Sequence, residues 1–249
     1  MQYATDVNLA ARQRLWHESR GEPALDLYSW VLELAAIEPG ERVADIGCGN
    51  GAYLALVRGA VGLDLSTGML ATAQGRVPNP LVCGDAQALP FGDDAFDVVL
   101  APHMLYHVAD RRAAARELRR VVRDGGRCIA VTNGAAARRE LKQLVEDAVG
   151  TGWRWGDDGD GPFKLENGAD QLRAGFDHVE LVRAPTTTTF VTQPDLLADY
   201  VGSVRELLEP LIGAPWDGVV EEVRRRAADI IERDGAVTIT GSVGAFVCR

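Results

Sequence analysis

The sequence predicts an α/β fold that is doubly wound around a mostly parallel sheet. Short apolar runs of strand length alternate with helix-length segments between residues 41 and 134, which is the pattern of consecutive strand–helix units. Most of these runs are apolar throughout, as is typical of parallel strands that are covered on both faces. The length of 249 residues suits one large domain of this class with a small helical cap.

Helical patterns precede the alternating region. Apolar residues recur at helical spacing from Leu27 to Leu34, and the Glu-Pro-Gly sequence at 38–40 ends that pattern. A shorter amphipathic pattern runs from Val7 to Leu15. We therefore expect residues 1–40 to form an N-terminal helical cap.

The alternating region itself should supply the core of the sheet. Ser66 or Thr67 is placed to cap one of its helices, and Asp110 to cap another, because their side chains can accept hydrogen bonds from the first helical amides. The expected strands are 42–46, 60–65, 81–83, 97–101 and 127–132, and the expected helices are 52–57, 68–74 and 111–122.

The second half of the chain is less regular. The expected helices are 138–149, 195–204 and 217–233, the expected strands are 179–182, 186–189 and 245–248, and 151–162 reads as a loop. No linker, repeat or low-complexity tract separates a second domain. We therefore expect one domain over 1–249, in which 1–40 is the cap, 41–134 the cofactor-binding core, and 135–249 the substrate-side elements and the C-terminal strands.

The charge balance argues against a nucleic-acid partner. The formal net charge is −10, whereas a protein that tracks phosphates usually carries a basic face. Arginines do cluster between Arg111 and Arg123, but acidic residues interrupt them, as on a solvated helix face. No signal peptide is expected at the N-terminus and no apolar run approaches the length of a membrane span. The expected location is the cytoplasm.

The four cysteines carry no metal-binding pattern. They form no Cys-x-x-Cys pair, and no histidine lies at ligand spacing beside one. Each lies in or beside an apolar segment, so we expect reduced, buried thiols. They are Cys48, Cys83, Cys128 and Cys248. No metal ion is expected.

A glycine loop closes the first strand of the core. The segment V-A-D-I-G-C-G-N-G runs from Val43 to Gly51. Glycine lets the backbone approach a ligand closely, because no Cβ stands in the way. Residues 47–52 also fit the dinucleotide fingerprint G-x-G-x-x-G/A, which by itself does not choose the cofactor.

Three aspartates follow the first three strands of the core. Asp45 lies at the end of the first strand, where a buried carboxylate needs partners, and could order the loop amides or face an ammonium through water. Asp64 ends the second strand and can accept both hydroxyls of a ribose, as it also would for NAD. Asp85 follows the third strand beside backbone amides and suits the amino group of adenine. The ordered set predicts an adenosine-containing cofactor.

Four segments follow one another in this region: the glycine loop at 43–51, V-G-L-D-L-S at 61–66, C-G-D-A-Q-A-L-P-F at 83–91 and F-D-V-V-L-A-P-H-M-L-Y-H-V at 96–108. In this order they resemble the class I methyltransferases that use S-adenosylmethionine (SAM), specifically the group with a type 11 methyltransferase domain. The resemblance extends from about Val43 to Thr132. It implies a seven-stranded Rossmann-like sheet with N-terminal helices and a helical insertion before the last strand. It also implies SAM as cofactor and S-adenosylhomocysteine (SAH) as product. The flanks, with N-L-A-A-R near Asn8 and L-E-N-G at 165–168, look like one bacterial subgroup.

The resemblance also assigns roles to individual residues. Gly47 and Gly49 would contact the methionine portion of SAM, and Asp64 its ribose. The backbone carbonyl of Ala101 would accept from the ammonium group. The adenine would be bound or flanked by Leu65, Met69, Asp85 and Ala86. Arg12 and Tyr3 would close over the site from the N-terminus.

One feature departs from the family pattern. Only 13 positions separate Gly51 from Asp64, so the first crossover helix should be about one turn shorter than usual. Removing one turn of ~3.6 residues keeps the same helix face inward. We therefore expect a trimmed helix.

Candidate bases lie in the segment after the fourth strand. His103 and His107 are four residues apart and would share one face if that stretch were helical. Both are catalytic candidates, with Tyr106 between them, because a neutral histidine can accept a proton near pH 7. Trp153, Trp155 and Phe163 in the second half could line an apolar substrate pocket or belong to the core.

The expected activity is methyl transfer from SAM to O, N or C of a small molecule, in specialised metabolism. Two alternatives remain open. A nicotinamide-dependent oxidoreductase would also use the glycine loop and Asp64, although Asp85 counts against it. A SAM-binding regulator without catalysis is the second. The acceptor, the methylated atom and the oligomeric state do not follow from the sequence.

Overall fold

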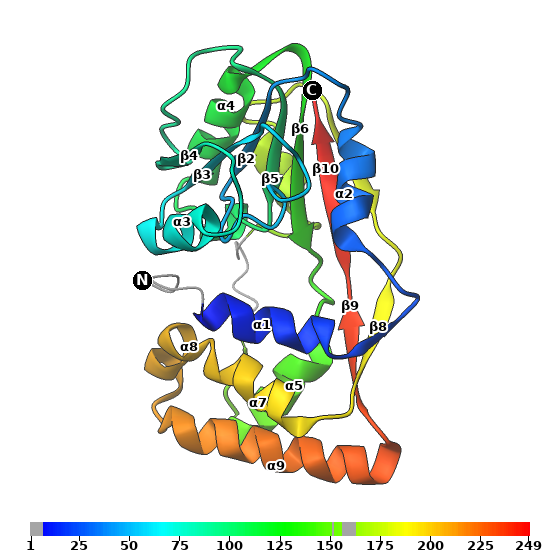
Figure 1. Cartoon of the computed structure of the whole chain (residues 1–249). Coiled ribbons are helices and arrows are strands. Elements are labelled where there is room, and N and C mark those ends of the chain that lie inside the picture. Colours follow the sequence, from blue (N-terminus) through cyan, green and yellow to red (C-terminus); the bar gives the residue numbers. More distant parts are fainter. Residues whose placement is uncertain (1–6, 151, 156–162) are drawn as a thin grey trace. The chain divides into compact units, whose positions relative to one another are not determined.

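The computed structural model describes residues 7–150, 152–155 and 163–249. The chain divides into two compact units. Within the described residues, unit 1 comprises 7–25, 136–155 without 151, and 185–242, whereas unit 2 comprises 26–135, 163–184 and 243–249. Figure 1 labels the elements of both units.

Unit 2 is built on a seven-stranded sheet with the order β4-β3-β2-β5-β6-β10-β7. The first five strands in that order pair in parallel, and β10 is antiparallel to both of its neighbours. The predicted doubly wound, mostly parallel, seven-stranded fold is therefore confirmed. The strands are β2 (Val43–Ile46), β3 (Val61–Asp64), β4 (Leu81–Cys83), β5 (Phe96–Pro102), β6 (Val122–Asn133), β7 (Val179–Arg183) and β10 (Val243–Cys248).

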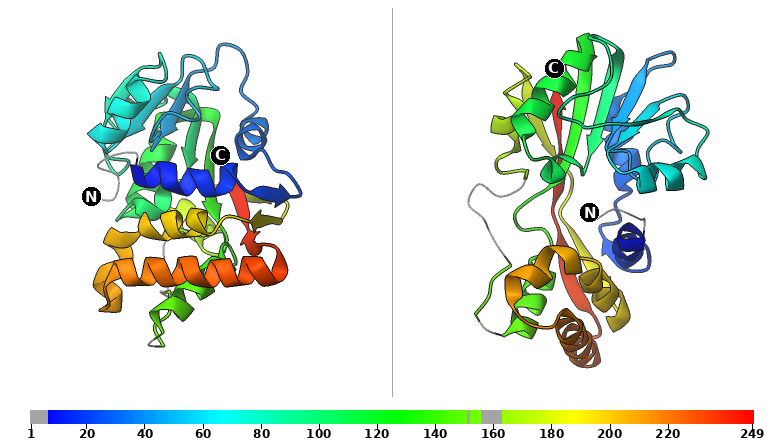
Figure 2. Two further views of the ribbon diagram at one scale, coloured as in Figure 1. Left: turned by 60° about the horizontal axis from the view of Figure 1, so that its bottom comes forward. Right: turned by 90° about the vertical axis from the view of Figure 1, so that its left-hand side faces the viewer.

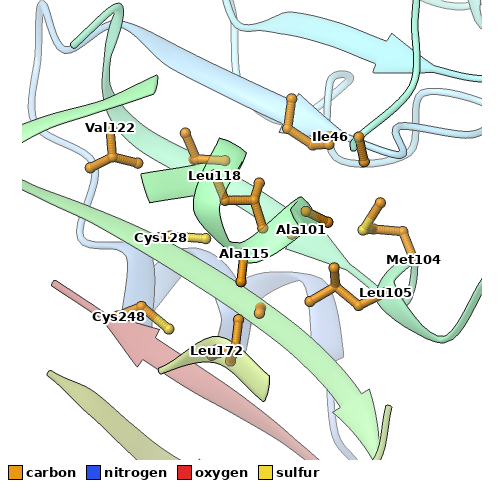
Figure 3. Close-up of a cluster of buried hydrophobic side chains, with 14 of the residues drawn as sticks. Ile46, Ala101, Met104, Leu105, Ala115, Leu118, Val122, Cys128, Leu172 and Cys248 are labelled. Carbon is orange, nitrogen blue, oxygen red and sulfur yellow. The ribbon is translucent and has the colours of Figure 1, made fainter. Parts of the chain in front are cut away.

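Successive residues of the central strands feed two separate cores, one on each face of the sheet. In β5, Val99 and Ala101 belong to one core and Val98 and Leu100 to the other. This alternation follows from the two-residue period of a strand. Ala115 and Leu118 from one helix pack on the first face, where Figure 3 shows them over the sheet.

The helices of unit 2 begin where the sequence supplies caps. Asp26, Ser66 and Asp110 each accept hydrogen bonds from amides of the first turn that follows them. Ser66, and not Thr67, is the cap of its helix. The helices are α2 (Leu27–Ala35), α3 (Thr67–Gln74), α4 (Arg111–Val121) and α6 (Gly168–Leu172), with the 3₁₀ turn η1 (Leu105–His107).

The expected helix at 52–57 is wrong. The segment from Gly49 to Leu56 is a series of turns, in which the amide of Ala55 donates to the carbonyl of Gly51 and the amide of Val57 to that of Tyr53. Gly51 and Gly59 both have positive φ, +82° and +79°, which places left-handed residues at both ends of the segment. The short crossover closes with turns in place of a regular helix.

Unit 1 holds a second, smaller sheet with the order β1-β8-β9, antiparallel throughout. The 186–189 run is confirmed as a strand, but it belongs to this separate sheet. Figure 2 shows the long α9 with the other helices of unit 1. The elements are α1 (Val7–His17), β1 (Arg20–Glu22), α5 (Arg139–Val149), β8 (Thr187–Val191), α7 (Pro194–Gly202), α8 (Arg205–Ile212), α9 (Trp216–Asp234) and β9 (Val237–Gly241).

The two units interleave along the chain. Residues 163–184 and 243–249 of the expected substrate-side part carry α6, β7 and β10, which complete the sheet of unit 2. The expected cap is likewise divided, because α1 lies in unit 1 and α2 in unit 2. That the whole chain acts as one domain stays a prediction. In the part of the chain that the structure describes, no helix is long and apolar enough to cross a bilayer.

Candidate cofactor site

The glycine loop after β2 has the backbone that its sequence predicts. Gly47, Gly49 and Gly51 all have positive φ, at +74°, +54° and +82°, a conformation that a Cβ makes costly. A Cβ on Gly47 would also lie 2.5 Å from Cβ of Met104. The amides of Gly47 and Cys48 donate to the carbonyl of Leu63 in β3. The loop is therefore fastened to the strand that ends in Asp64.

Asp64 joins the glycine loop to the start of α3. Its Oδ2 accepts from the amide of Gly49 at 2.8 Å, and its Oδ1 accepts from the amide of Ser66 at 2.8 Å. A carboxylate oxygen has two acceptor sites, so each oxygen keeps one for a further donor. Asp64 is half-buried, and its position at the end of β3 is the one that the ribose assignment requires.

Asp45 is a buried carboxylate without a partner. It is 1% exposed, and neither oxygen accepts a hydrogen bond from any described residue. The Gly49 amide that it could have ordered donates to Asp64 instead. Burial raises the pKa of Asp45 to about 7, and the negative charge of Asp64 adds to that rise. An uncompensated buried carboxylate is costly, so the site fits a cationic or donating group from a ligand.

Tyr53 lies near this carboxylate and was not singled out by the sequence. Its hydroxyl is buried and neither donates nor accepts a hydrogen bond among the described residues. Burial raises the pKa of Tyr53, with smaller contributions from Tyr28 and Asp45. The rings of Tyr28 and Tyr53 lie 4.9 Å apart. A tyrosine just after a glycine loop has no sequence signature of a functional residue, because it cannot be told from an ordinary core residue.

The proposed flanks of the adenine differ in exposure. Leu65 is 62% exposed, whereas Met69 is 2% and Ala86 6% exposed. Leu65 follows Asp64 directly and precedes the cap of α3. An exposed leucine at that position offers an apolar surface that a flat ring could cover.

Asp85 sits in a tight turn and is held by Gln87. Its Oδ1 accepts from the backbone amide of Gln87 at 2.9 Å, and the Gln87 side-chain amide donates to Oδ1 at 3.1 Å and to Oδ2 at 3.0 Å. The carboxylate thus stabilises its own turn, and the turn fixes where the carboxylate points. Asp85 can therefore stabilise the turn and still be available to a ligand.

Ala101 lies just past the pairing of β5 with β2. That ladder ends at Asp45 opposite Leu100, whereas on the other side Ala101 still pairs with Ala130 of β6. Figure 3 shows Ala101 and Met104 at the same end of the sheet as Ile46. The position next to the end of β2 is compatible with a carbonyl that accepts from a ligand.

His103 and His107 do not share a helix face. His103 has φ +55°, and its amide donates to the carbonyl of Val131, so it extends the pairing of β5 with β6. Only Leu105–His107 is helical. The centroid of the Tyr106 ring lies 6.4 Å from that of His103 and 4.5 Å from that of His107, which it meets edge-on. A left-handed non-glycine residue costs about 1–3 kcal/mol and is frequent at functional sites.

The remaining candidates lie elsewhere. Phe163 is 2% exposed and stacks edge-on with Phe246 in the core of unit 2, 5.6 Å away. Trp153 and Trp155 pack against the core of unit 1. Arg12 donates to Ser203 within unit 1, and Tyr3 lies outside the described residues. The roles of Arg12 and Tyr3 at the cofactor stay predictions.

The expectation of buried thiols is confirmed for three of the four cysteines. Cys48, Cys128 and Cys248 are buried, as expected, and burial raises the pKa of each thiol. The expectation of a buried thiol is wrong for Cys83, which is exposed because it lies on β4, an edge strand of the sheet. It borders a hollow between α3 and β4 that does not include the three aspartates.

Residues 44–130 match the sequence profile of a family described as methyltransferase domain. The matched segment begins in β2 and ends in β6, so it contains every predicted cofactor-binding residue. The predicted resemblance to a methyltransferase domain is confirmed over this segment.

Curated relatives match over the same part of the chain. The demethylmenaquinone methyltransferase of Mycobacterium tuberculosis is 43% identical over 97 residues, which cover 37% of this chain and 41% of the relative. The enzyme of the same name from Mycolicibacterium paratuberculosis is 45% identical over 98 residues, or 37% and 42% of the two chains. The chain thus spans about two fifths of the length of these relatives.

Solved structures share the fold over most of the chain. A protein described as a methyltransferase from an antibiotic biosynthesis pathway of Anabaena variabilis has a TM-score of 0.66 at 16% identity, covering 91% of this chain and 98% of that one. A Haemonchus contortus phosphoethanolamine N-methyltransferase, solved with SAH, has a TM-score of 0.54 at 19% identity. The match covers 90% of this chain and 53% of that one. The [4+2]-cyclase SpnF has a TM-score of 0.55 at 20% identity, and the match covers 90% of this chain and 80% of that one. At these identities the likeness shows the fold alone.

Proposed function

We propose that this chain, whose residues 44–130 form a methyltransferase domain, transfers a methyl group from SAM to O, N or C of a small-molecule acceptor, as in specialised metabolism. The observation that carries the proposal is Asp45, a carboxylate that is 1% exposed and has no partner among the described residues. It lies opposite Gly62, two residues before Asp64 on the adjacent strand, and the charge of Asp64 contributes to its raised pKa. Such a pair suits a ligand with an ammonium group at one end and a ribose at the other.

The chain's own residues would hold the cofactor by its polar ends. Asp45 would face the ammonium, and the acceptor sites left on Asp64 would take the ribose hydroxyls. Gly47 and Gly49 would let the backbone approach the methionine portion. Asp85 and Ala86 would bind the adenine edge between Leu65 and Met69. The carbonyl of Ala101, past the last partner on β2, would accept a further hydrogen from the ammonium.

SAM supplies an activated methyl group on a sulfonium. The protein then needs mainly to align the acceptor and exclude water, and positioning alone can contribute ~7–11 kcal/mol to lowering the barrier. His103 would hold the proton that the acceptor loses, if its nucleophile must lose one, and this would add about 10²–10⁴-fold. His107, with Tyr106 against its ring, is the second candidate.

Two other functions make different demands on the same residues. A nicotinamide-dependent oxidoreductase would use the glycine loop and Asp64, but its cofactor carries no ammonium group that could donate to Asp45. A SAM-binding protein without methyl transfer would use every cofactor contact and no base. The shared fold of the cyclase SpnF is a reason to test catalysis separately from binding.

Isothermal titration of the full chain with SAM, SAH, NAD and NADP tests the cofactor. We expect binding of SAM and SAH and no binding of either nicotinamide cofactor. Binding of NAD without SAM would overturn the proposal. A screen of acceptors with methyl-labelled SAM then separates an enzyme from a binding protein, because only an enzyme transfers the label.

A further inference from the structure

The side chain of Gln87 connects the Asp85 carboxylate to the start of α4. Its Nε2 lies 3.1 and 3.0 Å from the two carboxylate oxygens, and its Oε1 accepts from the backbone amide of Asp110 at 2.8 Å. Asp110 in turn caps α4 by accepting from the amide of Ala113 at 2.9 Å. One half-buried amide therefore joins the turn after β4 to the first turn of a helix.

These partners fix which way the Gln87 amide points. A backbone N–H can only donate, so the atom that faces Asp110 must be the oxygen. The NH₂ group then faces Asp85 and donates to it, as a carboxylate requires. The orientation follows from hydrogen-bond chemistry alone, and a flipped amide would put two donors against each other.

The segment that carries Asp85 is also fastened to α4 further along. Glu117 accepts from the amide of Leu89 at 2.7 Å, and Arg120 donates to the carbonyls of Leu89 and Phe91 at 3.0 and 2.8 Å. Gln87 is thus the first of several links between this segment and α4. It differs from the others because, among the described residues, it alone donates to the Asp85 carboxylate.

We propose that Gln87 is a positioning residue that sets the adenine specificity of the site by holding the Asp85 carboxylate toward the amino group of the base. The inference rests on the proposed function, because it takes Asp85 as the adenine acceptor. Oδ1 of Asp85 accepts from both the backbone amide and the side-chain amide of Gln87, whereas Oδ2 accepts only from the side-chain amide and keeps one acceptor site for a donor from the ligand. A 6-oxo purine presents an acceptor where adenine presents this donor, so a fixed carboxylate rejects it.

The test compares SAH with S-inosylhomocysteine, its 6-oxo analogue, by isothermal titration. The wild type should prefer SAH by about tenfold or more, since an unmatched hydrogen bond to a charged group costs that much in affinity. Gln87→Leu loses both contacts of the amide. Gln87→Glu keeps an oxygen for the Asp110 amide but cannot donate to Asp85. Both variants should lose most of the preference for SAH.

The Glu variant separates positioning from a merely structural role. If Gln87 only anchored the turn to α4, Gln87→Glu would keep the preference while Gln87→Leu lost it, and the proposal would be wrong. Glu117→Gln is the matched control, because it alters the Leu89 link without touching Asp85, and it should keep the preference. In a double-mutant cycle, Asp85→Ala with Gln87→Leu should discriminate no less than Asp85→Ala alone.

The outcomes also separate this inference from the proposed function. If the wild type binds neither SAH nor its analogue, the SAM site itself is wrong. If the wild type binds SAH with the expected preference and folded Gln87→Glu and Gln87→Leu retain it, only the role of Gln87 is refuted. Thermal unfolding of each variant establishes that it is folded.

Discussion

The backbone amide of Gly49 donates to Oδ2 of Asp64 at 2.8 Å, so the residue assigned to ribose also holds the glycine loop in place. Its other oxygen binds the Ser66 amide at the start of α3. Under the proposed ribose assignment, ligand binding and loop order would depend on the same carboxylate. Substitution of Asp64 should affect both at once.

Asp64→Ala should weaken SAM binding by about ten- to a hundredfold, because hydrogen bonds to a charged acceptor contribute roughly 1.5–3 kcal/mol. It should also lower the melting temperature, since the amides of Gly49 and Ser66 lose their acceptor. Asp64→Asn should lose less affinity, although its NH₂ group would face the backbone amide of either Gly49 or Ser66 and could not accept a hydrogen bond from it. Titration calorimetry and thermal unfolding measure the two effects. Asp124→Ala, which removes a carboxylate that is 91% exposed, is the control.

The affinity for SAH should rise with pH up to about 7. Burial raises the pKa of Asp45 to about 7 in the folded protein, against about 3.9 in an unfolded chain. A protonated Asp45 must lose its proton before it can pair with an ammonium, so below pH 7 affinity should change by up to about tenfold per pH unit. Titrations between pH 5.5 and 7.5 measure this slope.

The same shift predicts the stability of the ligand-free protein. Between about pH 4 and 7 the folded state binds the extra proton, so the free energy of unfolding should fall as pH rises and level off above 7. Asp45→Asn should flatten both the stability and the affinity profiles, whereas Asp85→Asn should leave both slopes in place. A pH-independent affinity in the wild type would remove Asp45 from the ammonium site.

His103 should affect turnover more than cofactor affinity. If it is the base, replacing it should lower kcat by about 10²–10⁴-fold while SAM affinity changes little. Because its φ is +55°, His103→Gly and His103→Asn suit the backbone, whereas His103→Ala keeps the backbone strain. Equal loss of rate in all three assigns the effect to the ring. If affinity falls together with rate, the ring only packs against the cofactor.

An acceptor that loses no proton predicts another pattern. The single-turnover rate would then survive in His103→Asn, and the rate would show no rise with pH through the pKa of a histidine. Single-turnover measurements on the same protein samples used for titration decide between the two. An unchanged rate in every variant would remove His103 from the catalytic residues.

The chain should not be retained on RNA at physiological ionic strength. Its formal net charge is −10, and Arg119, Arg120 and Arg123 on and after α4 are paired with carboxylates. Phosphate contacts would need unpaired basic side chains and would give a strong salt dependence. Retention on tRNA or duplex RNA that falls steeply with salt would contradict the small-molecule acceptor.

The sheet of unit 2 and its helix caps could be predicted because their signals are local. The strands are apolar runs bounded by polar turns, and Ser66 and Asp110 precede their helices directly. The candidate site is local in the same sense, since each aspartate lies within two residues of the end of a strand. The structure adds what these residues share, such as the bond between Gly49 and Asp64, which joins positions 15 apart.

Other features could not be read from local pattern. The three residues of β1, Arg-Gly-Glu, carry no apolar signal, because this edge strand has no buried position. The turns at 52–57 replace a helix because the crossover is too short, although the residues themselves suit a helix. For β9 a signal was present: Val237 and Ile239 are buried with the exposed Thr238 between them. Gln87 is ordinary in sequence, and its role depends on Asp110, which is 23 positions away.

The interleaving of the two units has a consequence for how such a protein diversifies. The stretch shared with known methyltransferases, 44–130, supplies β2 to β5 and most of β6, while β7 and β10 return to the same sheet only after long excursions. The excursion before β10 leaves at residue 185 and ends at 242. A change of length within this excursion would therefore leave its entry and exit points where they are, and it would not shift the register of the parallel strands β2 to β6.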